Sequence, residues 1–226
     1  MTILKYIAIA VVGYLLGNIS GGVLIARGFG VKDIRKHGSG NSGSTNVLRT
    51  LGWLPGVLTL VGDCLKGYIA CLIGKALGGD PGMLLAGIGA ILGHDFPVFM
   101  GFKGGKGIAT SLGLILAISP WLGLAHLVLV VVVVDVTRYM SIGSIIASFA
   151  FPVLTAILYP QRPNYPLFVI AAALAAALSL YRHKGNIERL RRGEENRLDF
   201  DRISRISDKV MKRMRDRKAR KAEKDD

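Results

Sequence analysis

The chain has 226 residues, 51% of them hydrophobic, and its mean hydropathy is +0.44. It also carries 29 Lys and Arg against 15 Asp and Glu, for a net charge of +14. Long uncharged runs alternate with short charged patches, and runs of roughly 20 apolar residues match the hydrocarbon thickness of a bilayer. A soluble protein is excluded, because too little polar sequence would remain to cover so apolar a core.

Seven apolar segments predict membrane helices, since lipid offers no partner for unpaired backbone groups. In chain order they are residues 3–26, 53–77, 83–100, 108–119, 120–134, 142–159 and 166–181. The stretch 108–134 has two interpretations. It is either one span kinked at Pro120 or two short helices that meet at Ser119-Pro120.

The distribution of charge favours two helices in this stretch. Basic residues in short loops remain on the cytoplasmic side of a membrane. With two helices, the basic loops 27–52 and 102–107, Arg138 and the basic tail all lie on one side, whereas one helix would put the tail on the other. We therefore predict an all-α, polytopic bundle of seven transmembrane helices, with the N-terminus outside and the C-terminus inside.

Four polar segments interrupt the apolar pattern, and the first covers residues 39–49, Ser-Gly-Asn-Ser-Gly-Ser-Thr-Asn-Val-Leu-Arg. Glycines let several backbone N–H groups point at one anion, and Ser, Asn and Thr add donors. Arg49 adds a planar fork suited to phosphate. A flexible linker would need neither two Asn nor an Arg. The candidate binding residues are Ser39, Asn41, Gly43, Thr45, Asn46 and Arg49.

The second segment is Gly-Asp-Cys-Leu-Lys-Gly at residues 62–67, inside an apolar run where charge is costly and usually functional. Asp63 and Lys66 are three residues apart, so they share a helix face and neutralise each other. Their flanking glycines, Gly62 and Gly67, predict a broken helix that offers backbone groups to a polar ligand. The alternative is a pair that only stabilises helix packing.

The third segment runs from residue 93 to residue 110. Two lysines, Lys103 and Lys106, lie in a glycine-rich turn before a predicted helix, which makes an anion site by geometry and dipole. Gly104 and Gly105 belong to this turn. His94 is either a proton carrier or a structural residue that forms hydrogen bonds.

The fourth segment, residues 182–195, follows the last predicted span. His183 and Asn186 are three apart and share a helix face. A basic patch that meets anionic lipid headgroups is the alternative, and both roles can coexist. The sequence has neither a metal-ligand cluster nor the Gly-x-Ser-x-Gly elbow of serine hydrolases.

These four motifs resemble those of the bacterial acyl-phosphate:glycerol-3-phosphate acyltransferases, the PlsY family, over residues 1 to about 195. The resemblance implies that acyl phosphate gives its fatty acyl group to the 1-hydroxyl of sn-glycerol 3-phosphate. The products would be lysophosphatidate and phosphate, in phospholipid biosynthesis. It implies a multi-pass protein of the bacterial inner membrane with its active site facing the cytoplasm.

The resemblance also implies roles for individual residues. The expected catalytic residues are Ser39, Arg49, Lys106, His183 and Asn186. The expected substrate-binding residues are Asn41, Gly43, Thr45, Asn46, Gly62, Asp63, Lys66, Gly67, His94, Lys103, Gly104, Gly105, Ser141 and Ser144. The choices between Lys103 and Lys106, and between Ser141 and Ser144, as phosphate ligands stay open.

No metal is expected, because no metal-ligand cluster is visible in the sequence, and no cofactor is expected either. Because acyl phosphate is already activated, no covalent nucleophile on the protein is needed. The expected partners are acyl phosphate, sn-glycerol 3-phosphate and membrane lipid, and not nucleic acid. A transient contact with the enzyme that makes acyl phosphate is left open. We expect residues 1–195 to form the transmembrane acyltransferase domain and residues 196–226 a basic cytoplasmic tail. An apolar stripe at Ile203, Ile206, Val210 and Met214 predicts that this tail forms a helix lying on anionic lipid.

Two other classes of protein fit less well. An organophosphate transporter would explain a broken helix with buried charges, but the polar motifs crowd one face and no internal repeat is visible. The acyltransferases with a soluble catalytic domain use a His-x4-Asp motif. None of the four His of this chain has Asp five residues on.

Overall fold

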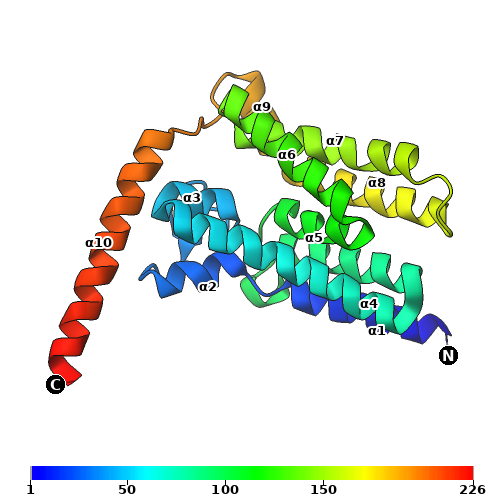
Figure 1. Ribbon diagram of the computed structural model, residues 1–226, viewed down its shortest axis with the longest axis horizontal. Helices are drawn as coiled ribbons and strands as arrows, with labels where there is room; N and C mark the ends of the chain where they lie inside the picture. Colours follow the sequence, from blue (N-terminus) through cyan, green and yellow to red (C-terminus); the bar gives the residue numbers. More distant parts are fainter. Residues whose placement is uncertain (1, 226) are drawn as a thin grey trace. The chain divides into compact units, whose positions relative to one another are not determined.

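The computed structural model describes residues 2–225, and every regular element in that range is helical. The α-helices are α1 (Thr2–Gly17), α2 (Gly21–Gly28), α3 (Ser44–Leu51), α4 (Trp53–Asp95), α5 (Ile108–Ile118), α6 (Pro120–Thr137), α7 (Met140–Leu158), α8 (Tyr165–Arg182), α9 (Lys184–Arg191) and α10 (Phe200–Asp225), with 3-10 turns at Ile34–Lys36 and Val98–Met100 (Figure 1). The all-α prediction is confirmed.

The chain divides into two compact units. The first unit contains Met1–Ser20 and Val61–Arg197, and the second contains Gly21–Leu60 and Leu198–Asp226. The first unit therefore holds most of the apolar helices. The second joins the glycine-rich segment before α3 to the C-terminal helix, although these are far apart in sequence.

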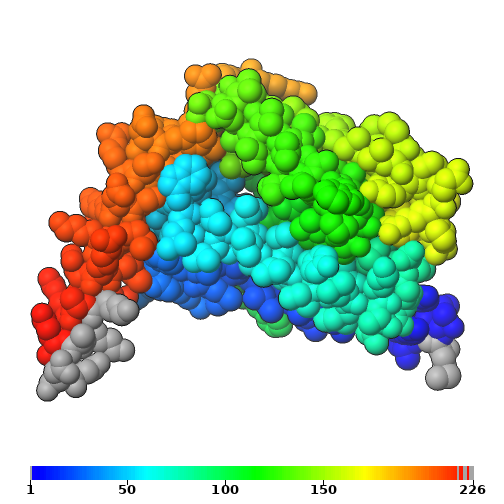
Figure 2. Space-filling model, viewed as in Figure 1, coloured from blue at the N-terminus to red at the C-terminus, as the bar shows by residue number. Residues whose placement is uncertain are grey.

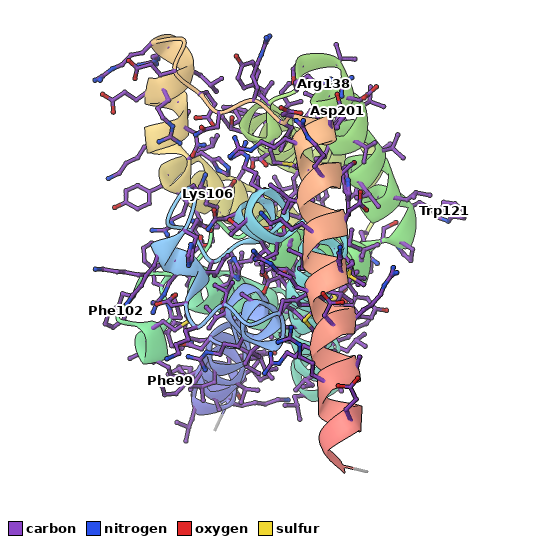
Figure 3. All side chains as sticks on the ribbon, turned by 90° about the vertical axis from the view of Figure 1, so that its left-hand side faces the viewer. Phe99, Phe102, Lys106, Trp121, Arg138 and Asp201 are labelled. Atoms are coloured by element: carbon purple, nitrogen blue, oxygen red, sulfur yellow. The ribbon has the colours of Figure 1, made fainter. Side chains whose placement is uncertain are left out.

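Five helical stretches in the described range are long and apolar enough to cross a membrane. They are Thr2–Gly28, Trp53–Met100, Pro120–Thr137, Met140–Leu158 and Tyr165–Arg182, and Ile108–Ile118 is a shorter apolar helix. Large apolar side chains such as Trp121 and Val136 are almost 80% exposed, as expected for surfaces that face lipid. Figure 3 shows the Trp121 side chain pointing away from the helices.

The stretch 108–134 forms two helices, as its charge pattern predicted. α5 ends at Ile118 and α6 begins at Pro120. Ser119 is extended and caps α6, because its side chain accepts a hydrogen bond from the Leu122 N–H, and proline is well suited to a first helical position.

The long element α4 is a helical hairpin. Gly78 and Gly79 have non-helical dihedrals, and Gly79 has φ +63°. On either side of this bend, Gly74 and Gly82 lie so close that a β-carbon on one would collide with the backbone of the other. The prediction of two helices with a bend between them is thus confirmed, but the second, predicted at residues 83–100, ends at Asp95.

Two expectations about helix breaks are wrong. The predicted single helix at residues 3–26 is divided, since α1 ends at Gly17 and α2 begins at Gly21. The predicted break at Gly62–Gly67 does not occur, because α4 has helical dihedrals there. Gly67 instead allows the backbone of Thr110 on α5 to approach closely. The glycine therefore serves helix packing rather than a bend.

Small residues set the spacing of the other helices in the first unit. Gly13 and Gly17 of α1 lie directly against Ala86 and Ala90 in the second half of α4. Contact between backbones at small residues is a common way for membrane helices to associate. α6, α7 and α8 pack side by side (Figure 1). This packing brings loop residues at the helix ends together.

Candidate active site

The first unit joins residues of the third and fourth polar segments, together with Ser141, in one hydrogen-bonded network. The Lys106 Nζ donates to Asn186 Oδ1 at 2.5 Å, and the Asn186 Nδ2 donates to Glu195 Oε1 at 2.8 Å. Ser141 Oγ donates to the same Glu195 oxygen at 3.2 Å. Lys106, which is labelled in Figure 3, precedes α5, while Asn186 lies on α9 and Ser141 is the second residue of α7. The network thus holds the ends of three helices together.

Glu195 is the centre of this network, and the sequence interpretation did not count it as a site residue. Its side chain is buried, and its second oxygen accepts a hydrogen bond from Arg189 Nε at 2.9 Å. Of the two candidate serines, only Ser141 donates to Glu195. Ser144 donates to the Met140 carbonyl of its own helix. The sequence marks Glu195 only by its position, since it is an acidic residue at the end of the mostly basic segment 182–195.

The glycine-rich turn before α5 is held by Arg182, a second residue that the sequence interpretation missed. Arg182 Nε donates to the Gly105 carbonyl at 3.0 Å, and Nη2 donates to the Gly104 carbonyl at 3.2 Å. The Gly105 N–H donates to the His94 carbonyl at 3.0 Å. Lys103 is exposed whereas Lys106 turns toward Asn186. The turn therefore leaves Lys103 exposed to solvent and directs Lys106 toward the hydrogen-bonded network.

His183 lies beside this network and is 2% exposed. Its Nδ1 is 2.8 Å from the Ser179 carbonyl, which can only accept, so Nδ1 carries the proton. Burial, together with the positive charge of Lys106, lowers the pKa of His183 to about 4. The imidazole is therefore neutral at pH 7, and its Nε2 has a lone pair to accept a hydrogen bond.

Lys66 belongs to a separate buried cluster in α4. Its Nζ lies 2.8 Å from Asp63 Oδ1 and 2.8 Å from His94 Nδ1, and it donates to the Ile19 carbonyl at 2.7 Å. An ammonium group has three donors and no acceptor, so these contacts use all of them and make Nδ1 of His94 the acceptor. Lys66 and Asp63 do meet on one helix face, as their spacing predicted.

The second unit shapes the glycine-rich segment before α3 around Asn46. This side chain is 1% exposed. Its Nδ2 donates to the carbonyls of Asn41, His37 and Ile34 at 2.7, 3.0 and 3.2 Å. Its Oδ1 accepts the Ser39 N–H at 2.9 Å. Asn46 therefore acts inside the loop and fixes the position of Ser39.

The remaining candidates of the second unit lie on the same loop and helix. Asn41 Oδ1 accepts the Gly43 N–H at 2.7 Å, just before α3 begins at Ser44. Arg49 lies in the last turn of α3 and is half-buried, and Thr45 is half-buried in the first turn. The predicted anion loop is thus a short turn followed by a helix.

Comparison with known proteins gives the family. The family model described as glycerol-3-phosphate acyltransferase matches residues 7–193. The chain belongs to the glycerol-3-phosphate acyltransferase family. A glycerol-3-phosphate acyltransferase of Geobacter sulfurreducens is 46% identical over 195 residues, which cover 86% of this chain and 98% of that protein. One of Clostridioides difficile is 43% identical over 204 residues, covering 88% and 98%.

Two solved structures have the same fold. The crystal structure of PlsY, an integral membrane glycerol 3-phosphate acyltransferase, in its glycerol 3-phosphate form has a TM-score of 0.77 and 42% identity, covering 86% of this chain and 96% of that one. The lysophosphatidic acid form has a TM-score of 0.77 and 39% identity, covering 88% and 97%. Family membership and the apolar helices make the chain a multi-pass membrane acyltransferase.

Proposed function

We propose that this protein transfers a fatty acyl group from acyl phosphate to the 1-hydroxyl of sn-glycerol 3-phosphate, forming lysophosphatidate and phosphate. The observation that carries the proposal is the network of Lys106, Asn186, Glu195 and Ser141 beside a neutral His183. It combines a cation, amide and hydroxyl groups and a hydrogen-bond acceptor at the ends of apolar helices. Those are the groups needed to hold a phosphate and a hydroxyl at a membrane surface.

Both substrates carry phosphate, so their negative charges must be offset before they can meet. We assign this role to Arg49, Lys103 and Lys106. Lys66 is not included, because its three donors already contact protein groups. Arg49 contributes a planar fork for a phosphate, and the lysines contribute point charges.

The chemistry needs no covalent intermediate on the protein. The glycerol 1-hydroxyl oxygen attacks the acyl carbon, and the bond from that carbon to the phosphate oxygen then breaks, so phosphate leaves with the electron pair. His183 Nε2 accepts the hydroxyl hydrogen bond and orients the attack. Because the pKa of His183 is about 4, it is a weak base, and the proton passes to a phosphate oxygen. Asn186 Nδ2 and Ser39 are the candidate donors to the developing oxyanion.

The experiment that tests this function supplies one acyl donor at a time. The purified full-length protein is incubated with glycerol 3-phosphate and either acyl phosphate, acyl-CoA or acylated carrier protein, and lysophosphatidate is measured. We expect product only with acyl phosphate. Comparable rates with acyl-CoA would overturn the donor assignment, and uptake of glycerol 3-phosphate by sealed vesicles without conversion would favour a transporter.

We also propose the arrangement in the membrane. Seven spans in the bacterial inner membrane place the N-terminus outside and the site of residues 1–195, together with the tail 196–226, at the cytoplasmic face. The support is the clustering of basic residues in alternate loops. We expect an Arg162→Cys variant to react with an impermeant thiol reagent in intact cells and Lys184→Cys not to react. The unmodified chain is the control, because it contains free Cys64 and Cys71.

A further inference from the structure

The apolar stripe of the C-terminal helix α10 lies against other residues of the protein. Ile203 is 3% exposed, and Ile206, Val210 and Met214 are half-buried. These residues recur every three or four positions, so they share one face of the helix. α10 packs against α3 in the second unit, so the stripe is buried at Ile203 and partly covered at its other three positions.

The docked face of α10 also holds the junction between α3 and α4. The Trp53 N–H, the first donor of α4, donates to Ser207 Oγ at 2.8 Å. The Trp53 ring lies 5.7 Å from the Phe200 ring, and its Nε1 donates to Ser204 Oγ at 3.4 Å. First-turn N–H groups lack partners within a helix, and a side-chain oxygen from elsewhere can supply one. Ser207 therefore caps α4 from a position 154 residues away.

The residue before Trp53 shows how closely α10 approaches. Gly52 ends α3 with φ +91°, and its N–H donates to the Leu48 carbonyl. A β-carbon at Gly52 would collide with the backbone and side chain of Ser207. Glycine is thus required here both by its positive φ and by the contact with α10. The junction cannot shift without moving α10 as well.

We propose that α10 is a positioning element for Arg49. Arg49 lies in the last turn of α3, three residues before Gly52, so anything that fixes Gly52 and Trp53 also fixes the end of the helix that carries the guanidinium. α10 begins at Phe200, beyond residue 193, where the family match ends. The proposal rests on the proposed function, in which Arg49 offsets phosphate charge.

The opposite face of α10 has different chemistry. Exposed basic side chains lie there, at Arg202, Arg205, Lys209, Lys212 and Arg213. In Figure 2 this helix is the orange to red segment. If this basic face acted alone, by binding anionic headgroups, then α10 would matter in vesicles and not in detergent. A positioning role predicts a defect in both, because the contact with Trp53 is internal. This difference separates the two roles experimentally.

The central test compares Ser207→Val with Ser207→Thr in detergent, with glycerol 3-phosphate and acyl phosphate as substrates. The two replacements have nearly the same shape, and only Thr keeps the acceptor for the Trp53 N–H. We expect kcat/KM to fall by about fivefold in Ser207→Val, the size of a lost helix cap, and to stay within about twofold in Ser207→Thr. Arg205→Ala, on the exposed face, is the control and should keep wild-type kinetics. Equal kinetics of the Val and Thr variants would overturn the proposal.

A double-mutant cycle shows whether the effect passes through Arg49. In an Arg49→Lys background, Ser207→Val should cause no further loss, because the group that it positions is already altered. A full, additive loss in that background would overturn the proposal.

Truncation after Glu195 is the second experiment, and a folded truncated protein should be at least tenfold less active in detergent. Wild-type activity there, or a defect confined to anionic vesicles, would also overturn it. Failure of the proposed function would differ, because the unmodified protein would then make no lysophosphatidate.

Discussion

Two lysines in glycine-bordered motifs of the first unit have opposite surroundings. Lys66 is 7% exposed, and its three donors meet Asp63, His94 and the Ile19 carbonyl. Lys106 is half-buried, and it donates to Asn186 from the turn before α5 rather than from inside a helix. The comparison teaches that a lysine in a polar motif is not a substrate ligand by virtue of the motif. Whether such a lysine can bind substrate depends on which protein groups its ammonium group already contacts.

Removing the charge of Lys66 should have the largest effect of all, and this effect should be on the stability of the folded protein. Lys66→Met leaves the buried Asp63 without its cation, and breaking a buried pair from one side costs about 3–5 kcal/mol. We expect a lower midpoint of thermal unfolding in detergent, with near-normal kcat for the folded fraction. The double variant Asp63→Leu with Lys66→Met should recover part of the stability. A raised KM for glycerol 3-phosphate at unchanged stability would instead support the substrate-binding role expected from the sequence.

Lys106 should show the reverse pattern. Lys106→Ala removes a fixed cation from the site, and the loss of one such preorganised group costs about 100- to 1,000-fold in kcat. Thermal stability should change little. Lys103→Ala is the matched control on the same turn, and because that lysine is exposed, its loss should cost at most about fivefold. Equal losses in the two variants would remove the distinction between the lysines.

Arg182 tests whether the turn itself needs support. Arg182→Gln removes the donors to the carbonyls of Gly104 and Gly105, and hydrogen bonds from charged groups contribute about 1.5–3 kcal/mol each. We expect kcat/KM to fall by about tenfold because Lys106 loses its fixed position. Adding Lys106→Ala should then cost less than it does in the unmodified protein. Lys184→Gln, a neighbouring exposed cation, should behave like the wild type, and a similar loss there would point to headgroup binding.

The smallest expected effect is a dependence of stability on pH at His183. Its pKa is about 4 in the folded protein and 6.5 ordinarily, so the unfolded chain binds more protons between these values. The free energy of unfolding should therefore fall as the pH drops from 6.5 toward 4, and be insensitive to this residue above 6.5. Thermal unfolding of the wild type and of His183→Gln across that range measures the difference. A difference between the two that is constant with pH would contradict the lowered pKa.

The helices of this protein were predictable because they depend on local chemistry. Uncharged runs of about 20 residues must be helical in lipid, whatever their neighbours. The pair of Asp63 and Lys66 was predictable for the same reason, since their three-residue spacing lies within one helix. Charge in the loops also decided between one and two helices at Ser119-Pro120. In each case the residues that determine the structure lie close together in the sequence.

The partners of the polar side chains were decided only by the tertiary structure. Lys106 meets Asn186 across 80 residues and Ser141 meets Glu195 across 54, so no spacing in the sequence relates them. Small residues contribute to the packing of the helices next to these groups, because glycines let the backbones of α4 and α5, and of α6 and α7, approach closely. For the same reason Gly67 is a packing contact with Thr110 rather than a helix break. A glycine in the sequence permits either outcome, and the helix packed against it determines which one occurs.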